Sequence, residues 1–369
     1  MSDKQKQSQF VPGLKLAEGF FHEEVEPILK SRYPDLRYSA ALIGSGSEVL
    51  EFDTEMSADH HWGPRVMLFL RPGDFKAKSD VIRTALGNEL PPTYLGYSTN
   101  FSKPGDNGVQ LMQPVDGGPV NHRVATYTLD SFFLNYMNIH IKKMLEPTDW
   151  LTLPQQKLRS ITAGRVFHDE LGLEEIRARF SWYPHDVWLY ILASGWARIG
   201  QEEHLMGRAG FVNDEIGSAL IGSRLVRDIM RLAFLMEKEY PPYPKWFGTA
   251  FSKLKSAKNL NPILTNVLHS ASWQERESHL CQAYGILAKL HNDLKITEPV
   301  PPEAYQFFSR PFRIIGGEKL ANAIIARIAD PEVVPLTKLS LFGNIDTVSD
   351  NTDLLEDPSI RTKLKAIYK

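Results

Sequence analysis

The chain has 369 residues, of which 43% are hydrophobic and 23% charged, a balance typical of globular proteins rather than disordered ones. Its formal net charge of -2 provides no basic field, so we expect no nucleic-acid partner. The single cysteine, Cys281, excludes an intramolecular disulfide, and the N-terminus lacks an apolar signal core. We therefore expect a cytoplasmic protein, with no membrane partner because charged residues interrupt its apolar helical stretches.

The first 150 residues alternate between helical and strand patterns. Arg65–Leu70 is an almost unbroken apolar run, which is typical of a strand covered on both faces. We predict a mobile tail over residues 1–13 and a small α/β domain over residues 14–150. The predicted elements are, in chain order, a helix at Leu14–Arg32, strands at Tyr38–Ile43 and Arg65–Leu70, a helix at Asp74–Leu90, a loop at Pro91–Gly118 with a short strand near Val109–Met112, a strand at His122–Leu129 and a helix from Asp130 to Ile139.

From Pro154 to Leu294 the apolar residues follow helical periodicity. We predict a helical, bundle-like domain over residues 151–300 and a helical and polar segment over residues 301–369. The fold class is therefore α+β, with a small mixed sheet followed by a helical domain. The predicted helices are Asp186–Ile199, Ile216–Glu239, Trp273–Leu294 and Glu318–Ala329.

The segment from Gly44 to Arg65 carries the residues best suited to chemistry. It begins with a turn of small residues, which lets backbone N–H groups approach phosphate oxygens. Asp59, fifteen residues after Gly44, lies ahead of an apolar strand, where a carboxylate can hold a divalent cation against the same phosphates. The predicted nucleotide-binding residues of this segment are Gly44, Ser45, Gly46, Ser47 and Arg65.

A Gly-Ser turn followed by Asp-x-Asp on a strand is the signature of the nucleotidyltransferase superfamily, and this segment resembles it. Three stretches in order are similar to the domain of unknown function 4037 family within that superfamily: Gly46–Arg65, Gln201–Ser218 and Arg224–Trp246. The resemblance implies a nucleotidyltransferase fold with a helical companion domain. It also implies two or three carboxylates that hold two Mg²⁺ or Mn²⁺ ions, with an NTP as substrate and a hydroxyl on a small molecule or a protein as acceptor.

This sequence departs from the superfamily pattern at two acidic positions. The predicted metal ligands are Asp59 and His61, and His61 stands where the second aspartate is expected. Imidazole suits softer cations better than Mg²⁺. The strand that would carry the third carboxylate has Ala125 at the corresponding place.

The helical region supplies further candidates. Arg224, Arg227 and Arg231 share one helix face, which predicts a basic wall for a triphosphate or an anionic substrate, to which Lys245 adds. The alternative is a solvated face on which Asp228 pairs with Arg224. A general base is predicted among three acids, and the alternative is that they are charges at helix ends. These acids are Glu202, Glu203 and Asp214.

Three functional hypotheses follow from these residues. The first is a transferase that moves a nucleoside monophosphate from NTP to a hydroxyl with a divalent metal. The second is a degenerate, non-catalytic protein of the same fold that binds a nucleotide or a partner. The third is a hydrolase or another enzyme that uses a histidine-bound transition metal.

Overall fold

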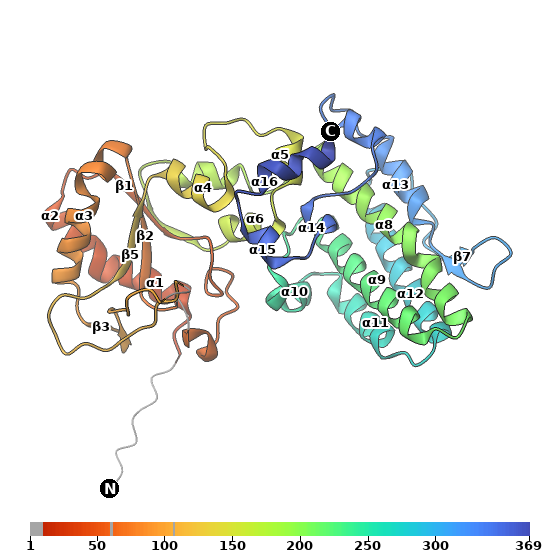
Figure 1. The fold of residues 1–369 in the computed structure, drawn as a ribbon, viewed down its shortest axis with the longest axis horizontal. Helices are drawn as coiled ribbons and strands as arrows, with labels where there is room; N and C mark the ends of the chain where they lie inside the picture. The colour runs from red at the N-terminus through yellow and green to blue at the C-terminus, as the bar shows by residue number, and fades with distance from the viewer. Residues whose placement is uncertain (1–9, 60–61, 106–107) are drawn as a thin grey trace, which may run out of the picture. The chain divides into compact units, whose positions relative to one another are not determined.

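The computed structural model describes residues 10–59, 62–105 and 108–369. The chain divides into two compact units. The N-terminal unit comprises residues 1–143 and 157–181, and the helical unit comprises residues 144–156 and 182–369 (Figure 1). The N-terminal unit carries a four-stranded mixed sheet, and the helical unit consists mainly of helices. The predicted α+β fold class is therefore confirmed.

The sheet of the N-terminal unit has the strand order β5-β2-β1-β6. Strand β1 (Tyr38–Leu42) lies antiparallel to β2 (Arg65–Leu70) and to β6 (Arg165–Asp169), and β2 lies parallel to β5 (Arg123–Tyr127). All five residues of β1 are buried, as expected for a strand in the middle of a covered sheet. The strands predicted near β1, β2 and β5 are confirmed.

Helices cover this sheet and connect its strands. The predicted first helix is confirmed, with a π-helical turn in its middle, and Phe20 and Phe21 at that turn are fully buried in the core. Phe10, in the predicted tail ahead of this helix, stacks on Trp62. Residues 1–9 of that tail lie outside the described part of the chain. The elements are α1 (Gly13–Phe20), η1 (Phe21–Val25), α2 (Glu26–Arg32), η2 (Glu55–Asp59), α3 (Pro72–Glu89), β3 (Thr93–Tyr94), β4 (Tyr97–Ser98), α4 (Leu129–Met137), α6 (Gln155–Thr162) and α7 (Leu173–Ala178).

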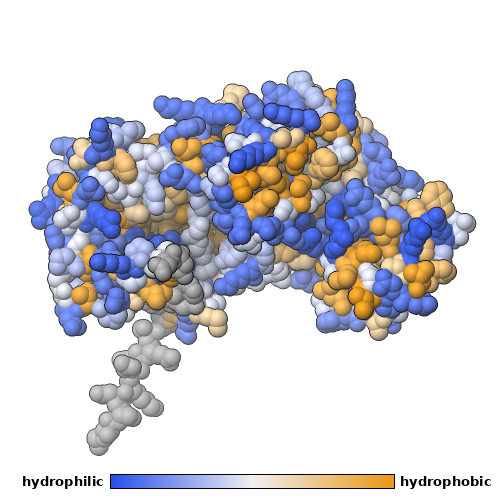
Figure 2. Space-filling view, in the orientation of Figure 1, coloured by the Kyte–Doolittle hydropathy of each residue, from blue (hydrophilic) through white to orange (hydrophobic). Residues whose placement is uncertain are grey.

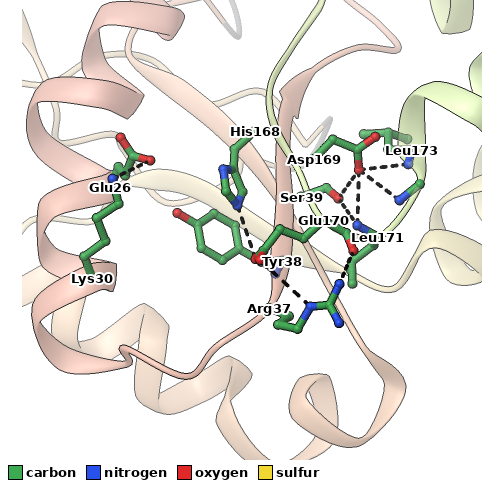
Figure 3. Close-up of polar contacts among 11 residues, drawn as sticks. Glu26, Lys30, Arg37, Tyr38, Ser39, His168, Asp169, Glu170, Leu171 and Leu173 are labelled. Atoms are coloured by element: carbon green, nitrogen blue, oxygen red, sulfur yellow. Dashed lines mark hydrogen bonds and ion pairs between the residues drawn. The ribbon is translucent and has the colours of Figure 1, made fainter.

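Strand β6 is a difference from the sequence analysis. It lies in the stretch predicted to be helical, and it belongs to the N-terminal unit although it follows the division predicted at residue 150. Its end is held by Asp169, which accepts the Ser39 hydroxyl at 2.6 Å and the backbone N–H groups of residues 171–174 at 2.9–3.2 Å. Figure 3 shows this carboxylate between β1 and the start of α7; the rings of Tyr38 and His168 nearby are tilted by 33°, with centroids 4.5 Å apart. The segment is a strand because it pairs with β1 and because Asp169 holds its end. Neither contact produces a periodic pattern in the sequence from which a strand could be predicted.

Gly164, immediately before β6, lies where a larger residue does not fit. Its φ is +74°, and a Cβ there would lie 2.1 Å from the carbonyl oxygen of Leu42. Because the obstacle is backbone and the conformation disfavours L-residues, Gly164→Ala is expected to lower the free energy of unfolding by at least about 2 kcal/mol. Urea denaturation measures the change. Gly73→Ala in α3 is the control, since a Cβ there meets nothing within 4 Å. Equal stability of the two variants would contradict the prediction.

The helical unit is built on α8 (His185–Phe211), which packs along α9 (Glu215–Met236) and α13 (Gly317–Ile325) (Figure 1). The backbones of α8 and α13 approach closely, because a Cβ on Gly317 would lie 2.3 Å from the carbonyl oxygen of Trp196. Helix α8 extends well beyond the predicted end at Ile199. Its second half buries Glu202 and Glu203, and these acids interrupt the apolar pattern from which its length was predicted.

The other predicted helices of this unit are confirmed in type. Helix α12 (Trp273–Asp293) matches the prediction closely, whereas α13 is shorter than predicted. None of the helices in the described part of the chain is both long and apolar enough to cross a membrane. The remaining elements are α5 (Pro147–Leu151), α10 (Pro244–Phe251), α11 (Ala257–His269), β7 (Tyr305–Gln306), β8 (Arg313–Ile314), η3 (Val334–Lys338), α14 (Ile345–Val348), α15 (Thr352–Glu356), α16 (Arg361–Leu364) and η4 (Lys365–Tyr368).

Apolar side chains are also exposed on the helical unit. Figure 2 shows hydrophobic residues gathered around the ends of α8, α9 and α11. Ile216 and Leu220, two of the apolar residues that predicted α9, are 78% and 62% exposed. Helical periodicity therefore identified the helix, but not which of its apolar residues enter the core.

Candidate functional site

The Gly-Ser turn lies directly after β1. Gly44 and Gly46 have φ of +84° and +144°, conformations that glycine adopts most easily. Residues 47–51 form further turns, and the next helical element among the described residues is η2. The turn therefore offers backbone groups but no helix N-terminus.

Arg65, the first residue of β2, holds this turn in place. Its Nη2 donates to the carbonyl oxygen of Ser45 at 2.7 Å, and its Nε donates to the carboxylate of Glu48 at 2.7 Å. Glu48 is buried, with 3% of its surface exposed, so the ion pair lies largely out of water. A Cβ on Gly46 would lie 2.4 Å from Nη2 of Arg65. A side chain at this position would displace the ends of Arg65 and Glu48, and the φ of +144° also favours glycine.

A cavity of about 1060 Å³ opens beside this turn, and we call it the β2–β5 cavity because both strands line it. Helices α3 and α4 and a loop complete its wall, the loop through Phe101, Lys103, Pro104, Gln110, Gln113 and Asn121. The loop is held closed by the bridge between Phe101 and Met112 and by Asn121, whose amide donates to the carbonyl oxygen of Phe101 at 2.8 Å. This bridge lies where the sequence predicted a short strand. The cavity is therefore a built feature of the N-terminal unit.

Basic side chains dominate the charge of this cavity. Among the described residues, its wall carries one carboxylate, Asp80, and four basic side chains. Arg65 and Arg123 lie opposite each other in the sheet register. Burial and then the charge of Arg65 lower the pKa of Arg123, and this outweighs the opposing effect of Glu48. These conditions favour an anionic ligand. The basic side chains are Arg65, Arg83, Lys103 and Arg123.

His122, which also lines the cavity, has both ring nitrogens occupied. Its Nε2 lies 2.9 Å from the carbonyl oxygen of Arg83, and its Nδ1 lies 3.1 Å from the backbone N–H of Val124. Nε2 therefore donates and Nδ1 accepts, which requires the neutral imidazole. Burial lowers the pKa of His122 and keeps this form. His122 accordingly supports the wall and adds no charge to it.

Aromatic side chains form another part of the wall, next to the Gly-Ser turn. Phe132 and Tyr136 of α4 are stacked, with ring centroids 5.6 Å apart and an interplanar angle of 6°. The hydroxyl of Ser45 lies 3.5 Å from that of Tyr136. The cavity therefore combines an aromatic surface, on which a planar base can pack, with a cationic surface for phosphates.

The structure describes only part of the predicted metal site. Asp59 ends η2, ahead of β2, but its side chain and residues 60–61, including His61, lie outside the described residues. Strand β5 pairs Ala125 with Met67 and has no carboxylate. Asp53 accepts hydrogen bonds from the Trp62 indole and the Gly13 N–H. No three His, Cys, Asp or Glu side chains in the described ranges form a group able to hold a metal ion, so that part of the chain does not fit a two-metal centre.

The acids predicted as general bases make structural contacts in the helical unit. Glu203 accepts backbone N–H groups from Ile315, Gly316 and Gly317 at 2.6, 3.3 and 3.1 Å, at the start of α13. Asp214 caps α9 by accepting the Gly217 N–H at 2.8 Å. Such contacts are those expected of helix caps, which was the alternative left open by the sequence.

The predicted basic face of α9 is matched by acids. Arg224 pairs with Glu202, and Arg227 pairs with Asp350 at 2.5 Å. Asp228 bonds to Arg198 at 3.3 Å, so the alternative pairing of Asp228 with Arg224 is not observed. Two further predicted cations, Arg231 and Lys245, lie near Asp346 and over the Trp246 ring respectively. The structure thus shows an ion-pair network here, and a nucleotide contact stays a prediction.

Comparison with known proteins bears on the helical region most directly. A solved structure, a nucleotidyltransferase-like protein from Exiguobacterium sibiricum 255-15, is similar over 75% of this chain and 78% of its own, with 8% identity and a TM-score of 0.32. A search of curated proteins found no significant match. The family model of the domain of unknown function DUF4037 matches residues 150–247 and covers the second and third motifs but not the first. The resemblance to this family is therefore confirmed for residues 150–247, which match the domain of unknown function 4037.

Proposed function

We propose that the N-terminal unit binds a nucleoside triphosphate in the β2–β5 cavity. The observation that carries the proposal is the combination in one cavity of four basic side chains and the stacked pair Phe132 and Tyr136. A triphosphate needs cationic donors, and a base needs a flat apolar surface. The volume of about 1060 Å³ accommodates a ligand of that size.

Arg123→Gln tests this proposal. Arg123 is partly buried in the cavity wall, opposite Arg65 in the β2–β5 register, so its loss removes charged donors from the phosphates. We expect the affinity for the preferred NTP to fall about 10- to 100-fold, the usual cost of a charged hydrogen bond. Isothermal titration calorimetry with ATP, GTP, CTP and UTP measures it.

The matched control is Arg37→Gln in the same unit. Arg37 pairs with Glu170 and takes no part in the cavity wall described above, so this variant is expected to bind like the wild type. If the wild type binds none of the four nucleotides, or if Arg123→Gln binds as tightly as Arg37→Gln, the proposed site is wrong.

Transfer of a nucleoside monophosphate to a hydroxyl acceptor, on a small molecule or a protein, is our second candidate. It is favoured by the order of the Gly-Ser turn, η2 ending at Asp59, and β2. Mg²⁺ or Mn²⁺ in that reaction would depend on Asp59, since the described residues add no metal-binding cluster. Pyrophosphate release from NTP in the presence of candidate acceptors tests it. Release that survives Asp59→Asn unchanged would remove Asp59 from the chemistry.

A further inference from the structure

We propose that the β2–β5 cavity binds the phosphates of its ligand directly through basic side chains, without a bridging metal ion. The inference rests on the proposed function, because it specifies how that same site holds a nucleotide. It departs from what the resemblance implies, namely carboxylates that hold two divalent cations against the triphosphate. The ligand class is a polyphosphate, either as part of a nucleotide or alone.

The charge of the cavity wall favours phosphate over a metal ion. In a metal-bridged site, carboxylates face the metal and the metal faces the phosphates. Here the described wall has four basic side chains and only Asp80 as a carboxylate. Arg65 is also paired with the buried Glu48 beside the wall, so four basic side chains stand near two carboxylates. The excess of positive charge repels a divalent cation and attracts a phosphate. The basic side chains therefore supply the positive charge that a metal would otherwise provide.

The register of the sheet places two arginines side by side. Strands β2 and β5 are parallel, and Arg65 on β2 lies opposite Arg123 on β5. The register places Met67 opposite Ala125, where the resemblance leads one to expect a carboxylate on β5. Two arginines from adjacent strands thus stand together at the strand starts, in a cavity that none of the described β5 side chains makes acidic.

The protein holds the arginines of the cavity in fixed positions. Its Nε and Nη2 are bonded to Glu48 and to the Ser45 carbonyl oxygen, which fixes the plane of its guanidinium. The ring of Phe101 lies 5.7 Å from the guanidinium carbon of Arg123, which orients the second cation. Lys103 is exposed on the loop and can follow the ligand. The site is thus preorganised by protein contacts alone.

Calorimetry on the full-length protein with and without divalent cations separates the two modes of binding. ATP and inorganic tripolyphosphate are each titrated in excess EDTA and again in excess Mg²⁺. We expect the dissociation constant for ATP in EDTA to be equal to or lower than that in Mg²⁺. The reason is that Mg²⁺ bound to ATP reduces the negative charge that the basic side chains attract. Binding at least tenfold tighter in Mg²⁺ overturns the inference and leaves the proposed function standing. If neither ligand binds in either buffer, the proposed function fails as well.

Asp80→Asn sharpens the test. Asp80 is exposed on α3 and is the carboxylate that the described wall presents to the cavity. If phosphates bind the basic side chains directly, its neutralisation strengthens ATP binding in EDTA two- to threefold. If Asp80 holds a bridging metal, the same change weakens binding in Mg²⁺ and has no effect in EDTA, which overturns the inference. Asp74→Asn, also on α3 but paired with Lys78, is the matched control and is expected to change neither value.

Discussion

Replacing Asp149 with alanine is expected to lower the free energy of unfolding of the protein by about 3–5 kcal/mol. Asp149 is 1% exposed and accepts from Arg361 at 2.9 Å and from Lys365 at 2.6 Å. These contacts tie the C-terminal residues to α5 within the helical unit. Removal of the carboxylate takes a buried ion-pair partner from both Arg361 and Lys365, which costs more than the pair itself contributes. Urea denaturation followed by circular dichroism measures the loss.

A surface ion pair is the control for this variant. Glu298 pairs with Arg327 at 3.3 Å, and its side chain is 91% exposed. Glu298→Ala is therefore expected to change the free energy of unfolding by less than about 1 kcal/mol. If Asp149→Ala is no more destabilising than this control, the ion pair at the C-terminus does not hold the unit together.

The same carboxylate gives a pH dependence with a definite sign. Burial alone would raise the pKa of Asp149, but hydrogen bonds from Lys365 and Arg361 outweigh it and lower the pKa to about 2. A lowered folded-state pKa contributes stability that is present above the ordinary value near 4 and is lost as the pH falls towards 2. The stability of the wild type should therefore fall across this range more steeply than that of Asp149→Asn, as urea midpoints at each pH would show.

Glu203→Ala is expected to destabilise the protein by a similar amount, about 3–5 kcal/mol. Glu203 is buried, and its carboxylate accepts the backbone N–H groups of residues 315–317, where β8 passes into α13. Alanine would leave these N–H groups buried without an acceptor, and the start of α13 would lose its contact with α8. Thermal and urea unfolding both report the change.

The conservative variant separates a structural role from a chemical one. Glu203→Gln keeps one oxygen that can accept these N–H groups, so it should recover part of the stability lost in alanine. A general base behaves differently, because both variants would abolish turnover while the unfolding free energy stays at the wild-type value. That second outcome would show that our structural assignment of Glu203 is wrong and would restore it as a catalytic candidate.

The local pattern of the chain was enough to predict most elements of both units. Apolar spacing predicted α9 and α12, and an unbroken apolar run predicted β2, because these signals lie within one element. Strand β6 was missed, since its residues become a strand only through β1 and the Asp169 carboxylate. The second half of α8 was missed because buried acids stand where apolar residues were expected.

The candidate site divides in the same way. The Gly-Ser turn and Arg65 were recognised from neighbouring residues, and the structure brings them together through one hydrogen bond. Arg83, Lys103 and Arg123 were not recognised, because they lie on a helix, a loop and a strand that are far apart in the chain. A single basic residue on a helix or loop carries no signal until folding sets it beside others.

By itself, therefore, the sequence determined the types of most elements, the α+β class and the resemblance now confirmed over residues 150–247. Only the tertiary structure decided what the charged residues contact. Glu203 became the acceptor at the start of α13, and Arg224 became the partner of Glu202. The physical reason is range: periodicity acts over a few residues, whereas the pairing of buried charges depends on contacts between residues that are distant along the chain.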